Sequence, residues 1–236
     1  MPSKENNHDS PFFYGWVIVA AAFLVTAMAY GLQYSFGVFF KPLLTDFGST
    51  RAATSLAFSL YMIIHGISGI FMGGLADKYR ARLSVVLGGL FIGGAMVLTS
   101  HISAIWQLYL FYSVLAGIGM GGAYTPLAAI ISKWFVNKRG MALGIATAGI
   151  GMGTLVMSPL CQHLILSYGW RASYTIVGIM ALVIIIGSAL LLSRGPEEKG
   201  LLPDGESKPD KWRAEPTYTP QEEHIPLSSA IRTRSL

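Results

Sequence analysis

Between Phe12 and Ser193 the chain carries only two acidic residues, Asp46 and Asp77. Charged residues make up about 25% of an ordinary soluble domain, whereas they make up only 12% of this whole chain. A stretch this long with so little charge cannot present a normal solvated surface. We therefore predict that it lies in a lipid bilayer, where only helices and closed barrels satisfy every backbone polar group.

Apolar runs divide this stretch into segments of membrane-spanning length. A helix needs about 20 mostly apolar residues to cross a hydrocarbon core about 30 Å thick, because each residue adds about 1.5 Å. The sequence contains six such runs. We predict an all-α membrane protein, a six-transmembrane-helix bundle over residues 12–194, with helices near 16–40, 52–76, 83–100, 104–131, 141–166 and 172–193.

Basic residues between the runs predict the orientation of the bundle. With a cytoplasmic segment at 1–11, the inner loops hold six basic residues and the outer loops three, which fits the excess of Lys and Arg on the cytoplasmic side. The inner set is Lys78, Arg80, Arg82, Lys133, Lys138 and Arg139, and the outer set is Lys41, Arg51 and Arg171. We expect a multi-pass plasma-membrane protein with both termini cytoplasmic.

Composition changes after the last run. Residues 195–236 are polar and interrupted by prolines from Pro196 to Pro226, a composition that cannot bury much apolar surface. We expect a disordered cytoplasmic linker or tail. The single cysteine, Cys161, excludes an intramolecular disulfide framework and a cysteine-based zinc cluster. The net charge of +5 is spread over loops beside membrane spans, so we expect lipid and not nucleic acid as the partner.

Two segments carry recognisable motifs. Residues 73–82 match the signature G-x-L-a-D-r-x-G-r-k of the major facilitator superfamily at Gly73, Asp77, Lys78 and Arg82, although Arg80 stands where the glycine belongs. Residues 133–149 resemble the monocarboxylate-transporter pattern W-F-x-x-[KR]-R-x-x-A-x-G-x-A-x-A-G, with matches at Trp134, Phe135, Lys138, Arg139, Gly144 and Gly149. The opening Tyr14-Gly15-Trp16 and the later Phe39-Phe40-Lys41 add to this resemblance.

The resemblance covers residues 12–195 and points to the monocarboxylate and oxalate–formate branch of that superfamily. It implies one half of a twelve-helix fold, in which each half contains two three-helix inverted repeats and the site lies near the bilayer midplane. The chain would then be the N-terminal half of a secondary transporter for a small organic anion, acting by alternating access. Its implied partner is a C-terminal six-helix half, from the same gene or a separate chain, and no cofactor is expected.

Polar residues inside the predicted helices are candidates for the substrate cavity. Tyr30, Gln33 and Tyr34 share one face of the first helix, since they lie at i, i+3 and i+4. His65 lies in the middle of the second helix, where an ionisable group tends to face the protein interior. Tyr124 and Thr125 precede a proline in the fourth helix. The alternative for all six is ordinary hydrogen bonding between helices.

The resemblance also implies roles for charges and glycines. It gives Asp77, Lys78 and Arg82 a gating role at the cytoplasmic face, against the plainer role of fixing topology. Tyr34 stands where proton-linked relatives have a lysine, which favours exchange of the oxalate–formate type. Because no Lys or Arg lies deep inside the six helices, a counter-charge for an anion would come from the other half. Glycines four residues apart in 140–153 and 117–121 predict close helix packing.

Other functions remain as alternatives. A sugar or drug carrier of the same superfamily is possible, as is a truncated fragment with no independent transport. An intramembrane enzyme is disfavoured because the chain has no H-E-x-x-H motif and no G-x-S motif facing a histidine on another helix. The phosphate-binding pattern G-x-x-x-x-G-K-[ST] is also missing, so a solute or ion gradient would drive transport and not ATP. The sequence predicts no metal site and no catalytic residue.

Overall fold

The computed structural model describes residues 13–78, 81–193, 195–199, 201 and 203. Regular elements among these residues are all helices. The expected cytoplasmic segment 1–11 lies outside the described residues, as does most of the expected tail, including the unit Ser207–Leu236. The account below concerns the described part of Met1–Glu206.

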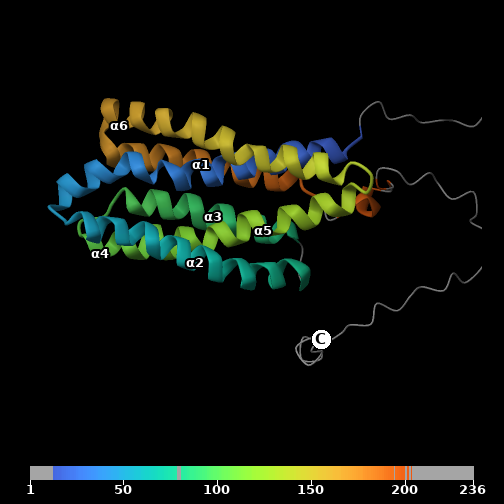
Figure 1. The fold of residues 1–236 in the computed structure, drawn as a ribbon, viewed down its shortest axis with the longest axis horizontal. Helices are drawn as coiled ribbons and strands as arrows, with labels where there is room; N and C mark the ends of the chain where they lie inside the picture. The colour runs from blue at the N-terminus through green and yellow to red at the C-terminus, as the bar shows by residue number, and fades with distance from the viewer. Residues whose placement is uncertain (1–12, 79–80, 194, 200, 202, 204–236) are drawn as a thin grey trace, which may run out of the picture. The chain divides into compact units, whose positions relative to one another are not determined.

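The helices follow the apolar runs (Figure 1). Five of the helical stretches in the described residues are long and apolar enough to cross a membrane. A π-helix, η1, joins the short α4 to α5 without a break, and η2 is a 3₁₀-helix. The elements are α1 (Gly15–Phe47), α2 (Arg51–Lys78), α3 (Ala81–Thr99), α4 (Ile105–Leu108), η1 (Tyr109–Ala116), α5 (Gly117–Trp134), α6 (Arg139–Leu191) and η2 (Pro196–Lys199).

The longest element, α6, reverses direction at Gly169. Its 53 residues would make a straight rod about 80 Å long, far more than a bilayer core of about 30 Å. Gly169 has φ 79° and ψ 164°, a conformation outside the helical region that residues with a side chain rarely adopt. The single glycine therefore serves as the turn between two helical segments, 139–168 and 170–191.

Contacts with α1 fix the directions of these two segments. A β-carbon at Gly149 would overlap Thr26, and one at Gly153 would overlap Ala27, so segment 139–168 runs parallel to α1. The second segment runs the opposite way. Trp170 contacts Phe47 near the end of α1, whereas the Tyr14 hydroxyl donates a hydrogen bond to the Leu191 carbonyl at 2.9 Å. Figure 1 shows the yellow and orange parts of α6 extending along α1.

A second set of contacts pairs α2 with η1 and α5. The Tyr109 hydroxyl donates to the Ala53 carbonyl at 2.9 Å, and the Ser113 hydroxyl donates to the Ala57 carbonyl at 2.6 Å. Further along, the Ser68 hydroxyl donates to the Gly117 carbonyl at 3.0 Å. Residue numbers increase in the same direction along α2 and along η1 and α5, so these helices are parallel.

The remaining helix, α3, packs between α5 and the second segment of α6. Gly88 lies against the backbone of Ala123, and Gly93 lies against the Leu182 side chain and the Gly178 carbonyl. Small residues at such contacts allow the close backbone approach on which helix association in lipid depends. The described core is therefore a set of helices joined through glycine contacts and side chain-to-carbonyl hydrogen bonds.

Three details differ from the sequence predictions. The predicted first helix ended at residue 40, but α1 continues to Phe47 because Pro42 removes only one backbone donor, and Gly48 ends the helix in the left-handed conformation at φ 56°. Lys41 therefore lies within a helix and not in an outer loop. The predicted loop between 166 and 172 shrinks to Gly169. The predicted regular helix at 104–131 instead contains the π-helical turn of η1.

Candidate functional site

Tyr30 is the centre of an aromatic cluster formed by α1, α2 and α5. Its ring lies 5.2 Å from the ring of Tyr124 in an edge-to-face arrangement and 6.3 Å from the imidazole of His65. Tyr34, one turn further along α1, stacks on Tyr30 at 6.3 Å. Four of the six residues that the sequence analysis selected for a cavity are therefore in contact.

Gln33 joins the same cluster through a tyrosine that the sequence analysis did not select. The Tyr61 hydroxyl donates to Gln33 Oε1 at 3.4 Å, and Gln33 Nε2 donates to the Met62 sulfur at 3.3 Å. Tyr61 also contacts His65, with 6.2 Å between the rings. The sequence held a signal for Tyr61, because Tyr61 lies four residues before His65 and residues four apart on a helix share a face. The "Tyr30 cluster" hereafter denotes Tyr30, Gln33, Tyr34, Tyr61, His65 and Tyr124.

Thr125 occupies a different position from the other five candidates. It lies against the small residues of α2: a β-carbon at Gly69 would be 3.6 Å from Thr125 Oγ1, and one at Gly73 would be 3.4 Å from its methyl carbon. Gly73, the first residue of the superfamily signature, therefore sits at the contact between α2 and α5. Thr125 lies beside the cluster and contributes to this helix contact.

An open groove adjoins the cluster at Tyr34. Gln33 and Tyr61 are buried, whereas Tyr34 is 46% exposed and lines a groove of about 360 Å³ between α1 and α2. Among the described residues the lining holds no charged side chain. It combines aromatic rings with hydroxyl groups: Tyr34, Phe36, Gly37, Phe40, Ser55, Phe58 and Ser59. The cluster and groove thus present neutral hydrogen-bonding groups on an aromatic surface.

The charged part of the signature between α2 and α3 is only partly described. Asp77 and Lys78 belong to the last turn of α2, but their side chains lie outside the described residues. Arg82 is exposed in the first turn of α3. The gating role suggested for these charges therefore stays a prediction.

The aromatic residues of the second motif, at the end of α5, contact both the beginning of α1 and the end of α6. Phe135 contacts Phe13 and Trp16, with ring centroids 5.5 Å and 5.1 Å apart. Trp134 contacts Tyr14 at 5.5 Å, and its indole N–H donates to the Ser193 carbonyl at 3.4 Å. Both motif aromatics are fully buried. The opening of α1, the end of α5 and the end of α6 are therefore joined at one end of the bundle.

The remaining residues of this motif divide into two groups. Gly149 lies in direct contact with Thr26 and the Phe23 carbonyl, so it is a close-packing position. A β-carbon at Gly144 would meet nothing within 4 Å among the described atoms. Lys138 and Arg139 are exposed at the start of α6. The motif thus supplies one packing glycine and exposed basic residues at a helix start.

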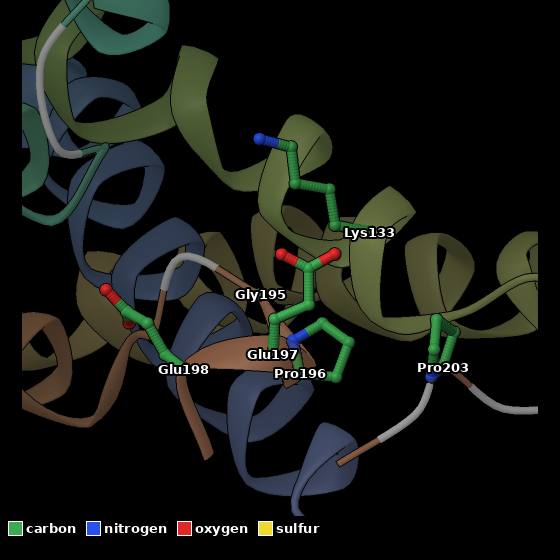
Figure 2. Close-up of a pocket in the computed structure, with 6 residues that line it drawn as sticks. All are labelled: Lys133, Gly195, Pro196, Glu197, Glu198 and Pro203. Atoms are coloured by element: carbon green, nitrogen blue, oxygen red, sulfur yellow. The ribbon is translucent and has the colours of Figure 1, made fainter. Parts of the chain in front are cut away.

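A second cavity lies beside this anchored end. Its volume is about 630 Å³, and Figure 2 shows the side chains that line it. The Ser193 hydroxyl donates to the Glu198 carboxylate at 2.7 Å, which holds η2 against the end of α6. The sequence analysis selected none of the lining residues, which are Lys133, Gly195, Pro196, Glu197, Glu198 and Pro203.

Comparison with known proteins agrees with the motifs. The sequence profile of the Major Facilitator Superfamily matches residues 22–235. Monocarboxylate transporter 14 of Mus musculus is 31% identical over 193 residues, or 82% of this chain and 38% of that protein. Monocarboxylate transporter 2 of Homo sapiens is 32% identical over 199 residues, or 84% of this chain and 42% of that protein. The chain thus spans about two fifths of the length of these curated relatives.

Solved structures show the same fold. A bacterial homologue of the human lysosomal transporter Spinster, in an inward-facing and unoccupied conformation, aligns with a TM-score of 0.71 at 19% identity. The alignment covers 93% of this chain and 48% of that chain. A peptide transporter of the POT type aligns with a TM-score of 0.61 at 18% identity, over 74% of this chain and 37% of that chain. All these relatives are transporters by name and none is an enzyme, as predicted. The chain is a multi-pass membrane protein that belongs to the major facilitator superfamily.

Proposed function

We propose that the chain is the N-terminal half of a secondary active transporter for a small organic anion, such as a monocarboxylate, oxalate or formate. The observation that carries this proposal is the Tyr30 cluster, where neutral polar groups from α1, α2 and α5 meet. The names of the relatives, which are monocarboxylate transporters, support the choice of substrate class.

The cluster suits an anion if a positive charge comes from elsewhere. Tyrosine hydroxyls donate hydrogen bonds to a carboxylate, and the edge of an aromatic ring is its positive side. The polar groups of the cluster and the groove at Tyr34 carry no permanent positive charge among the described residues. Our proposal therefore includes a second six-helix half, in the same gene product or a partner chain, that supplies the counter-charge and closes the cavity.

The arrangement of the helices supports six membrane spans. The five candidate spans become six when α6 is counted as two antiparallel segments on either side of Gly169. The pairing of α1 with 139–168 and of α2 with η1 and α5 has the form expected of two interleaved three-helix repeats. We propose a plasma-membrane protein whose N-terminus and η2 lie on the cytoplasmic side, with alternating access around the Tyr30 cluster.

A sugar is the second candidate substrate. The aromatic and hydroxyl lining of the groove at Tyr34 is as suitable for a neutral polyol as for an anion. An anion needs a counter-charge that the described residues of the groove do not provide, whereas a sugar does not. A transport measurement therefore distinguishes the two substrates.

The test is uptake into proteoliposomes. The chain and the complete reading frame of its native locus are reconstituted separately, and uptake of labelled oxalate, formate, lactate and glucose is measured with and without the same solute inside. We expect the complete product to take up an anion in a saturable manner, and we expect uptake to be faster when the same anion is inside the liposomes. Uptake of glucose alone, or of no solute by the complete product, would contradict the proposal.

Variants connect any activity to the cluster. Tyr30→Phe removes one hydroxyl while preserving the ring contacts with Tyr34, His65 and Tyr124. Loss of one hydrogen bond to a charged ligand costs about 1.5–3 kcal/mol, so we expect KM for the anion to rise by about tenfold or more. Tyr168→Phe is the matched control, because Tyr168 is 67% exposed at the turn of α6.

A further inference from the structure

Two basic residues flank the groove at Tyr34, and the proposed substrate site does not use them. Lys41 is an exposed residue of α1, and Arg51 is the exposed first residue of α2. Neither side chain has an ion-pair partner among the described residues. Both positive charges are therefore available to an anion that approaches the groove.

The helical register places both charges on the helix faces that line the groove. Lys41 lies seven residues, or close to two turns, after Tyr34, so it shares the Tyr34 face of α1. Arg51 lies four residues before Ser55 and shares the Ser55 face of α2. Residues 48–50 connect α1 to α2 at this end. Lys41 and Arg51 thus flank the end of the groove that lies nearest this connection, which we call the groove mouth.

The nearest acidic residue among the described ones does not neutralise these charges. Asp46 lies five residues after Lys41, which places its side chain on a different face of α1. Its carboxylate is bound instead to Arg171, with 2.8 Å between the charged atoms. The first turn of α2 contains no acidic residue beside Arg51. The described residues therefore give the groove mouth a net positive charge.

Hydroxyl groups continue from the groove mouth toward the Tyr30 cluster. Ser55 and Ser59 lie one turn apart on α2, both are exposed, and neither hydroxyl has a hydrogen-bond partner among the described residues. Tyr34 lines the same groove and stacks on Tyr30 at 6.3 Å. Each of these hydroxyls can donate a hydrogen bond to a carboxylate oxygen. The groove thus leads from two positive charges, past neutral donors, to the Tyr30 cluster.

We propose that Lys41 and Arg51 form a recruitment site for small organic carboxylates at the groove mouth. Unpaired charges at a cleft with apolar walls raise the local concentration of a ligand of opposite charge. In the proposed orientation the groove mouth faces the outside of the cell, so the site would collect the anion before it enters the groove. The choice of a carboxylate rests on the proposed function, whereas the electrostatic effect does not.

Reagents of opposite charge measure the potential at the groove mouth. Ser55→Cys in the Cys161→Ala background provides one thiol there, and the purified chain in neutral detergent reacts with a negatively or a positively charged methanethiosulfonate. At low ionic strength we expect the ratio of the anionic to the cationic rate to fall about threefold to tenfold in Lys41→Gln, and further in Lys41→Gln/Arg51→Gln. Lys41→Arg keeps the charge and should keep the ratio.

Lys133→Gln is the matched control, because it removes an exposed positive charge at the end of α5. It should leave the ratio unchanged. An unchanged ratio in Lys41→Gln/Arg51→Gln would overturn the proposal, as would an equal fall in the control.

Protection of the same thiol identifies the ligand, because a lipid phosphate carries the same negative charge as a carboxylate. Oxalate or lactate should slow the anionic reagent more than sodium chloride does at equal ionic strength, and Lys41→Gln/Arg51→Gln should abolish this protection. Protection by phosphatidylglycerol in mixed micelles but not by the carboxylates, or by neither, would overturn the recruitment site. If carboxylates protect the thiol but the complete product transports no anion, the proposed function fails and the site stands.

Discussion

Arg171 Nη1 lies 2.8 Å from Asp46 Oδ2, which ties the end of α1 to the residues just after the reversal of α6. The guanidinium also lies over the Trp170 ring at 4.2 Å and donates to the Ile102 carbonyl at 3.3 Å. Asp46 is one of only two acidic residues in the long apolar stretch, and this contact gives its charge a partner. Arg171 therefore joins three segments at one end of the bundle: α1, the loop after α3, and α6.

Removal of this contact should lower stability modestly. Both side chains are about half exposed, at 50% and 40%, so solvent weakens the pair, and such pairs contribute about 0.2–1 kcal/mol. We expect Arg171→Gln to lower the unfolding midpoint by about 1–4 °C. Asp46→Asn should have little additional effect in the Arg171→Gln background. Arg51→Gln, at the exposed first residue of α2, is the control, and full additivity of the first two variants would argue against a direct coupling.

Two glycines of α6, one closely packed and one not, should differ in their tolerance of alanine. A β-carbon at Gly153 would overlap the Ala27 carbonyl, whereas one at Gly151 would meet nothing within 4 Å. Overpacking costs about 1–3 kcal/mol, so Gly153→Ala should lower the unfolding midpoint by several degrees and Gly151→Ala should not. Thermal unfolding in detergent measures both. Equal effects of the two variants would show that α1 and α6 do not meet at Gly153.

The hydrogen bond between Tyr61 and Gln33 should show the cost of an unpaired buried amide. Gln33 is 2% exposed, and its Oε1 accepts from the Tyr61 hydroxyl. Tyr61→Phe removes that donor and should cost about 1 kcal/mol. The double variant Tyr61→Phe/Gln33→Met replaces both polar partners by apolar groups and should recover most of the loss. A double variant less stable than Tyr61→Phe alone would contradict this contact.

Cys161 should be unreactive while the bundle is folded. It is 0% exposed, and it is the single thiol of the chain. A maleimide dye should therefore label the folded chain far more slowly than the chain unfolded in denaturant. Tyr168→Cys in the Cys161→Ala background, where the side chain is exposed, should react rapidly without denaturant. Rapid labelling of the native cysteine would show that the first segment of α6 is packed differently.

The sequence predicted the helices better than it predicted their partners. The spacing of Tyr30 and Tyr34 placed both on one face of α1, and the Tyr30 ring contacts Tyr34, His65 and Tyr124. Their role in a substrate cavity stays a prediction. Tyr61 was missed because a tyrosine in an apolar run resembles ordinary packing until the neighbouring helix is known. The spacing of residues along a helix determines which of them share a face, but not which helix that face contacts.

The glycines of α6 and the π-helix η1 also show that the sequence does not reveal which helices contact one another. Gly144 and Gly149 belong to one motif, yet only Gly149 is closely packed, since close approach depends on where Thr26 of α1 lies. The π-helical turn of η1 left no sign in its apolar composition. It follows α4 within one continuous helix, and its side chains bond to carbonyls of α2 that are distant in sequence. Tertiary contacts determine such details.

The claim on which the account depends is that α6 crosses the membrane twice, so that the chain supplies six spans. Labelling of Tyr168→Cys in the Cys161→Ala background with a membrane-impermeant maleimide on intact cells tests this directly, with Asn137→Cys as the reference at the other end of the first α6 segment. We predict that position 168 is labelled from outside, and that position 137 is labelled only after permeabilisation. Labelling of both positions from the same side would contradict six spans and the proposed transporter half.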